Sequence, residues 1–126
     1  MNYTTVSHCG NDHQEWLKSV DFYDQDLDTL EKRLMEIVTK NNTRDVMAGV
    51  EHFQNQFIVQ RNNIDELRHS INEHAGKVAS GAQAHAGHME KALVGEHDGL
   101  GDQVRNFEKI FNELRHEYNL FLAKWF

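Results

Sequence analysis

The chain has 126 residues and a formal net charge of −7, with 13 Lys and Arg side chains against 20 Asp and Glu. This balance argues against a nucleic-acid partner, because a nucleic-acid binder needs a basic face to displace counterions from phosphates. The single cysteine excludes an intrachain disulfide framework. The absence of proline favours long helices. Nine histidines are the one compositional excess, so we expect any chemistry to involve them.

The first eleven residues contain neither the basic nor the apolar segment of a signal peptide. No apolar run approaches the roughly 20 residues that span a bilayer. Because the only thiol cannot form an intrachain disulfide and no export signal is visible, we expect a cytoplasmic protein with no membrane partner.

The first helix is predicted over about residues 12–40, where apolar residues recur at alternating steps of three and four. Asn11 and Gln14 form a capping-box pair at its start. Asn41 and Asn42 are typical of a helix stop, since asparagine tolerates the left-handed conformation. The face defined by this spacing contains His13, Trp16, Val20, Tyr23, Leu27, Leu30, Leu34 and Ile37.

The same spacing continues over about residues 44–80 and predicts a second helix, capped by Thr43 and ended by Ser80-Gly81. The link to the first helix is so short that the two helices must fold back as an antiparallel hairpin. The inward face of this helix contains Val46, Val50, Phe53, Phe57, Gln60, Ile64, Leu67, Ile71, His74 and Val78.

A third helix is predicted over about residues 82–126, with a break near 95–101, where three glycines fall within seven residues. Each glycine costs a helix about 1 kcal/mol relative to alanine. The strong part of its inward face contains Val104, Phe107, Phe111, Leu114, Tyr118, Leu122 and Trp125, and Ala86, Glu90, Leu93, His97 and Leu100 continue it in phase before the break.

The predicted fold is therefore one all-α domain over residues 1–126, a long antiparallel bundle of three helices with the third one kinked. A four-helix up-and-down bundle is the alternative, with a short additional helix at about 82–94.

Three segments, EHFQNQF (51–57), IDELRH (64–69) and FEKIFNELRHEYNLFLAKWF (107–126), resemble a group of small, uncharacterised helical proteins from bacteria of the Bacteroidetes type. The resemblance covers most of the chain and implies a helical bundle. It rests on helix-face residues and carries over no activity and no functional residue.

Two copies of Glu-x-x-His, at Glu66–His69 and Glu113–His116, are the pattern with which ferritin-like bundles hold two irons. In both copies the leucine after the glutamate lies on the buried face, so the Glu and His side chains point outward. At 1.5 Å per residue the two motifs also lie on the order of 20 Å apart along the bundle. A shared di-iron site is excluded, and a solvated surface pattern is the better interpretation.

Cys9 lies between His8 and His13, and a thiolate beside an imidazole is a known nucleophile or metal ligand. Its place before the expected helix start nevertheless favours an incidental free thiol in a frayed terminus.

A metal site is predicted from polar residues at buried positions of three helices. Counted from the turn between the first two helices, His13 lies about 40 Å along the first helix and His74 about 45 Å along the second. If the third helix starts at Gly81, Glu90 comes to about 42 Å, in the same layer. Two imidazoles and one carboxylate suit non-haem iron or zinc. Two alternatives are hydrogen bonds that set the helix register and a layer that protonates near pH 6.

The last helix is expected to extend beyond the turn between the first two helices, which would leave its final aromatic residues poorly covered. An exposed apolar patch of this kind marks an interface. We therefore expect a homo-oligomer, most simply a two-fold dimer, through Phe121, Leu122, Trp125 and Phe126.

Three functions follow from these patterns. A structural or protein-interaction bundle leads, because the strong signals are packing signals. A metal-binding or metal-sensing bundle that uses the histidine-rich end comes second, and an oxidoreductase built on that metal comes third. No catalytic residue is singled out, and the sequence favours a protein that is not an enzyme.

Overall fold

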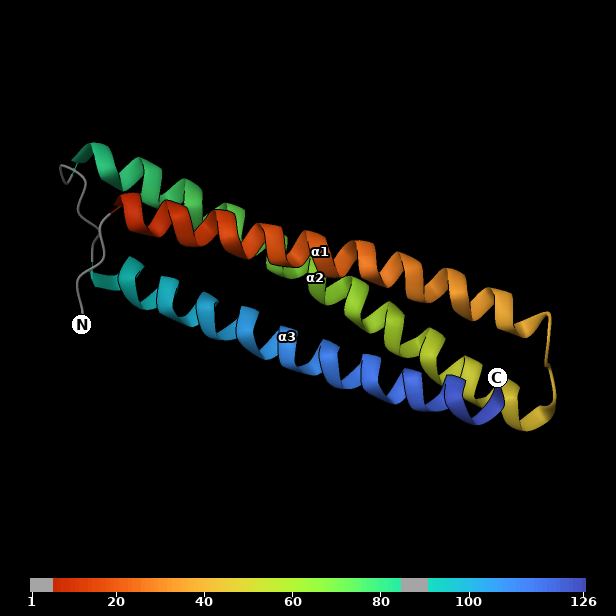
Figure 1. Ribbon diagram of the computed structural model, residues 1–126. Helices are drawn as coiled ribbons and strands as arrows, with labels where there is room; N and C mark the ends of the chain where they lie inside the picture. The colour runs from red at the N-terminus through yellow and green to blue at the C-terminus, as the bar shows by residue number, and fades with distance from the viewer. Residues whose placement is uncertain (1–5, 85–90) are drawn as a thin grey trace.

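The computed structural model describes residues 6–84 and 91–126, with side chains at 8–81 and 91–126. This part of the chain forms three helices and contains no strand: α1 (Val6–Val38), α2 (Arg44–Ala84) and α3 (Lys91–Trp125). α1 and α3 run in the same direction, and α2 runs antiparallel to both (Figure 1). The predicted all-α antiparallel bundle is confirmed.

The turn between α1 and α2 forms where the sequence predicts it. The backbone N–H groups of Lys40 and Asn41 both donate to the carbonyl of Ile37, at 3.0 Å each, and close the last turn of α1. The Asn41 side-chain oxygen then accepts a hydrogen bond from the Thr43 N–H at 3.2 Å. The Thr43 carbonyl accepts the first bond of α2, from the Met47 N–H, so Thr43 is the cap.

The helix bounds differ from the prediction at the other end of the bundle. α1 begins at Val6, well before Asn11, and α2 continues to Ala84 instead of stopping at Gly81. The described part of α3 begins at Lys91. The first two turns of α1 and the last turns of α2 therefore add a further layer to this end.

The break predicted near residues 95–101 is wrong, because α3 is helical throughout this segment. Gly101 lies buried under Trp16, where an added Cβ would come within 3.1 Å of the indole. Its neighbours Leu100 and His97 are also buried. Each glycine destabilises a helix by about 1 kcal/mol relative to alanine. Burial of this helix face offsets that cost, and Gly101 allows the Trp16 ring to pack closely against α3.

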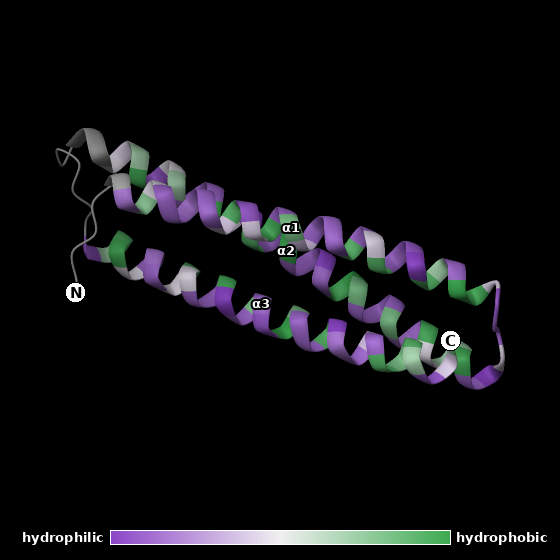
Figure 2. Cartoon of the chain, viewed as in Figure 1, coloured by the Kyte–Doolittle hydropathy of each residue, from purple (hydrophilic) through white to green (hydrophobic). Residues whose placement is uncertain are grey.

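The core is one continuous cluster that runs along the bundle axis, and hydrophobic residues recur on each helix between hydrophilic ones (Figure 2). Burial of each large apolar side chain stabilises the fold by about 1.5–3 kcal/mol. Aromatic rings from α2 and α3 meet at one level, where Phe53 and Phe57 contact Tyr118 edge to face. The fully buried large side chains include Val20, Leu27, Leu34, Ile37, Val46, Val50, Phe57, Ile64, Ile71, Phe111 and Tyr118.

Two arginines of α2 and one of α3 pair with acidic residues of α1 and fix its register against the other helices. The two on α2 are Arg61 and Arg68. Arg61 of α2 bonds to Asp28 and Glu31 at 2.7 Å each, and also to Asp24. Arg68 of α2 bonds to Asp21 at 2.7 Å.

On the opposite side of α1, Arg115 of α3 pairs with Asp26, with its Nε 2.9 Å from the carboxylate. The Ser19 hydroxyl donates to Glu108 of α3 at 2.7 Å. α1 is thus tied to both α2 and α3 by polar contacts near the middle of its length.

The C-terminal residues of α3 are better covered than the sequence suggested. Phe121, Leu122 and Trp125 are partly buried and pack against the core, while Phe126 remains 41% exposed. The Phe121 ring contacts Phe53 and lies directly over Gly49 of α2. Self-association through this end of the bundle stays a prediction.

None of the described helices is both long and apolar enough to cross a membrane.

The contact between Phe121 and Gly49 generates a test of the packing. An added Cβ at Gly49 would overlap the Phe121 ring, whereas a Cβ at Gly76 in the same helix meets nothing within 4 Å. We expect Gly76→Ala to raise the free energy of unfolding by about 0.5–1 kcal/mol through helix propensity. Gly49→Ala should lower it by about 1 kcal/mol or more, because the ring must move. Urea unfolding followed by circular dichroism measures both changes, and equal effects would contradict the packing.

Candidate metal centre

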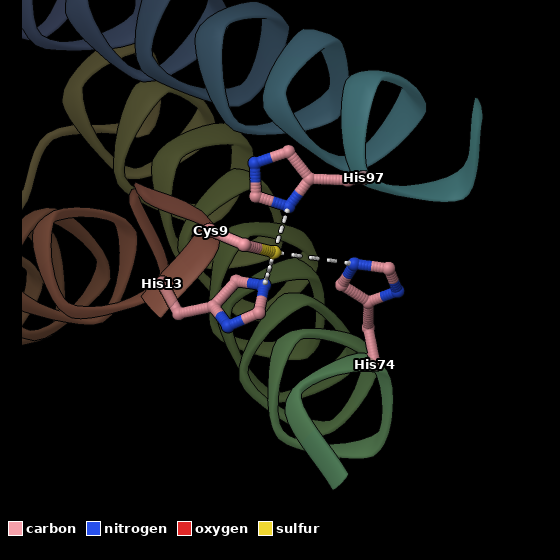
Figure 3. A group of neighbouring side chains, drawn as sticks. All are labelled: Cys9, His13, His74 and His97. Carbon is pink, nitrogen blue, oxygen red and sulfur yellow. Dashed lines mark hydrogen bonds between the residues drawn. The ribbon is translucent and has the colours of Figure 1, made fainter. Parts of the chain in front are cut away.

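Four potential metal ligands meet at the end of the bundle where α1 and α3 begin and α2 ends (Figures 1 and 3). Cys9 and His13 lie one helical turn apart in α1, so their side chains share a face. His74 comes from α2 and His97 from α3. All four are buried, with Cys9 and His74 at 0% exposure.

The sulfur of Cys9 is the centre of the group. It lies 2.9 Å from Nδ1 of His97, 3.3 Å from Nε2 of His13 and 4.0 Å from Nε2 of His74. The three imidazole rings surround the thiol with these nitrogens turned toward it (Figure 3). All four ligand atoms lie within 4.8 Å of one another.

These separations are close to those of a four-coordinate metal. Zinc bonds of about 2.3 Å to sulfur and 2.0–2.1 Å to nitrogen place the ligand atoms of a tetrahedron about 3.3–3.6 Å apart. The observed sulfur–nitrogen distances of 2.9, 3.3 and 4.0 Å bracket that range. Small side-chain rotations are therefore sufficient for Cys9, His13, His74 and His97 to hold one ion.

Two of the three histidines contact a carboxylate through the ring nitrogen that points away from Cys9. Nδ1 of His74 lies 2.9 Å from Glu96, and Nε2 of His97 lies 2.8 Å from Asp12. An ionised carboxylate only accepts hydrogen bonds, so each of these nitrogens carries the proton. The opposite nitrogen of each ring, which faces Cys9, then presents a lone pair. Carboxylates that orient histidines in this way are typical of metal sites.

The hydrogen bond from His74 also affects Glu96. It lowers the pKa of the Glu96 carboxyl, with the Lys77 ammonium contributing in the same direction. Glu96 is therefore ionised at neutral pH and is a competent acceptor.

Burial keeps Cys9 and His13 uncharged in the metal-free centre. Burial, with a smaller contribution from Asp12, raises the pKa of the Cys9 thiol to about 11. Burial, together with the neighbouring His74 and His97, lowers the pKa of His13 to about 4. At pH 7 Cys9 is thus a thiol and His13 an uncharged imidazole. A metal must displace the thiol proton, so its affinity depends on pH.

Trp16 covers the centre on the side of α1 and α3. Its ring centroid lies 4.6 Å from that of His97 and 5.5 Å from that of His13. The indole packs directly against Gly101, which explains why a glycine occupies this buried position of α3. Exclusion of water by the indole strengthens electrostatic interactions inside the centre.

The structure brings together two of the three residues predicted to bind metal. His13 and His74 are in contact, with ring centroids 5.1 Å apart. The third, Glu90, lies outside the described residues.

Sequence reasoning missed Cys9 and His97. The interpretation of Cys9 as a thiol in a frayed terminus is wrong, because α1 already includes it and buries it completely. His97 was predicted on the buried face, but Glu90 of the same face was chosen for the metal site. Signals for both were present: Cys9 precedes His13 by one helical turn, and His97 is in phase with Leu100 and Val104.

The paired Glu-x-x-His residues are exposed, as predicted. Glu66 and His69 on α2 and Glu113 and His116 on α3 all lie on the solvent side of their helices. They take no part in the buried centre.

No protein-family model matches the chain, and neither the curated proteins nor the solved structures contain a significant match. Function is therefore inferred from the chemistry of the centre.

The pKa of His13 predicts how the metal-free protein responds to acid. The unfolded chain takes up a proton at this imidazole near pH 6.5, whereas the folded chain takes it up only near pH 4. Because the unfolded state binds more protons in this window, the free energy of unfolding should fall as the pH falls from 6.5 to 4.

Urea titrations in the presence of a chelator would measure this pH dependence. His13→Gln should flatten the decline between pH 6.5 and 4 relative to the unaltered chain, while His116→Gln, at an exposed position, should not. An unchanged slope in His13→Gln would contradict a buried neutral imidazole.

Proposed function

We propose that this protein binds one divalent transition-metal ion through Cys9, His13, His74 and His97, and that the ion holds the ends of three helices together. The observation that carries the proposal is that four buried ligand atoms from three helices lie within 4.8 Å of one another. A metal-binding bundle was the second of the three functions that the sequence suggested.

A count of protons supports the proposal. The outward N–H groups of His74 and His97 are used by Glu96 and Asp12, so both rings direct lone pairs at Cys9. The thiol has one proton and can satisfy only one of these lone pairs. A buried acceptor without a donor costs about 1–3 kcal/mol. One cation accepts all the lone pairs and removes this cost.

The ligand set favours zinc. Thiolate and imidazole together are typical zinc ligands, and four protein ligands fill a tetrahedral shell. Non-haem iron oxygenases instead use two histidines and one carboxylate with open positions. The four ligand atoms described here come from three histidines and one cysteine, with no carboxylate among them. A filled shell supports a structural or sensing role over an oxidoreductase.

Metal binding in this arrangement is coupled to folding. Cys9 and His13 lie in the first turns of α1, His74 near the end of α2 and His97 near the start of α3. The unfolded chain does not hold these four side chains together, so the binding free energy adds to the stability of the fold.

The proposal predicts a metal-dependent gain in stability. Zinc added to chelator-treated protein at about 100 times the dissociation constant should raise the free energy of unfolding by about 2.7 kcal/mol. Cobalt should give the sulfur-to-metal charge-transfer band and the visible bands of a four-coordinate ion.

Variants identify the ligands. Cys9→Ala and His74→Ala should abolish the zinc-dependent increment and the cobalt bands, and His116→Ala should retain both. The comparison is between metal-loaded and metal-free forms of each variant, so a loss of intrinsic stability does not obscure it. An equal zinc response in all three variants would contradict the proposed ligands.

The two carboxylates give a second, independent prediction. Glu96→Gln and Asp12→Asn should weaken zinc binding by about 10–100-fold, since partners of this kind orient the histidines and raise their basicity. Glu73→Gln is the matched control, because Glu73 contacts exposed His69 and Lys77 at the same end of the bundle. Competition with a chromophoric chelator measures the affinities. Unchanged affinity in Glu96→Gln and Asp12→Asn would argue against their orienting role.

A further inference from the structure

The four ligands are buried, so an ion needs a route from solvent to Cys9. Two side chains span the boundary between solvent and the ligands. Asp12 is 29% exposed and contacts His97, and Glu96 is 40% exposed and contacts His74. Each carboxylate attracts a cation and touches a ligand, so there are two candidate entrances.

The entrance at Glu96 is unfavourable for a cation. The Lys77 ammonium lies 3.6 Å from the same Glu96 oxygen that accepts the His74 proton. Lys77 also lies 3.9 Å from Glu73, the other carboxylate on this side of α2. A fixed positive charge repels an approaching divalent ion and competes with it for the carboxylate.

The entrance at Asp12 has the opposite character. Nε2 of His8 lies 3.7 Å from the Asp12 oxygen that contacts His97, and the His8 side chain is 66% exposed. Within the described part of the chain, Asp12 contacts these two imidazoles and no lysine or arginine lies within 4.0 Å of its carboxylate. An exposed imidazole, a carboxylate and a buried ligand therefore follow one another from solvent to the centre.

The same turns of α1 carry both the outer pair and two inner ligands. His8 and Asp12 are one turn apart, as are Cys9 and His13, and the two pairs are adjacent on the helix surface. The end of a helix opens more readily than its middle. An opening confined to these turns would reach Cys9 before the core below it.

We propose that His8 and Asp12 form the entry port of the metal centre, where they hold the incoming ion transiently before it passes to Cys9 and His97. This inference rests on the proposed metal-binding function. A carboxylate has two oxygens, so Asp12 can bind the ion through one while the other keeps the His97 N–H. As the metal–sulfur bond forms, the Cys9 thiol releases its proton to water. His8 contacts the ion only in transit and is not a ligand of the final site.

The port is tested by the rates of cobalt uptake and of release to excess chelator, measured by stopped-flow absorbance. His8→Gln should lower both rate constants by the same factor, about fivefold or more, because a steering and capture site is lost. The dissociation constant should stay unchanged, since a transit residue affects forward and reverse rates equally. Lys77→Gln and the exposed control His116→Gln should leave both rates unchanged.

Three results would overturn the port. If His8→Gln takes up cobalt at the rate of the unaltered chain and with the same dissociation constant, His8 has no role in entry. If Lys77→Gln is the only variant with a changed rate and takes up cobalt faster, the entrance lies at Glu96. A larger dissociation constant for His8→Gln with an unchanged rate of cobalt uptake would make His8 a permanent ligand. Absence of the cobalt bands in the unaltered chain is distinguishable from all of these, because it overturns the metal centre itself and the port with it.

Discussion

The arrangement at the end of the bundle depends on one interaction, the convergence of imidazole lone pairs on a buried thiol. In the lower layers the inward positions of the three helices carry apolar side chains, apart from the buried Gln60 of α2, and packing satisfies the apolar ones. In the top layer the equivalent positions carry Cys9, His13, His74 and His97. Asp12 and Glu96 hold the outward protons of two rings, which commits those rings to face inward as acceptors. A cation is the partner that such a layer can use in full.

The convergence requires that the three helices stay in register over a long distance. A shift of one residue in a helix moves a side chain by about 1.5 Å along the axis and rotates it by about 100°, which is enough to remove a ligand from the centre. Apolar packing specifies the register less sharply, because a core tolerates exchanges of hydrophobic side chains as long as total volume and pattern are kept. The arginine pairs made by Arg61, Arg68 and Arg115 with acidic residues of α1 are directional, and so they specify the register. Contacts near the middle of the bundle thus serve the centre at its end.

The same dependence on register explains how much the sequence could predict. The fold and the His13–His74 contact follow from spacing, because the short turn at 39–43 allows heights on α1 and α2 to be counted from a common origin. No such origin exists for α3. Counting from Gly81 selected Glu90, whereas the α3 residue in the buried cluster is His97, seven residues later on the same face, or about two helical turns. Cys9 was missed for a different reason. The capping pair Asn11 and Gln14 predicts a helix start after Cys9, but both residues lie inside α1, whose first turns pack against the other helices.

The closed character of the centre bears on what an ion bound there would do. Catalytic zinc sites keep a position for water or substrate, while sites with four protein ligands act through shape. Here the described ligands already number four, and Trp16 packs over two of their rings. An ion held there would be shielded on the side that the indole covers, and its main effect would be on the helices that supply the ligands. Under the proposed function, one ion would join three helix ends, and its binding free energy would add to the stability of their contact.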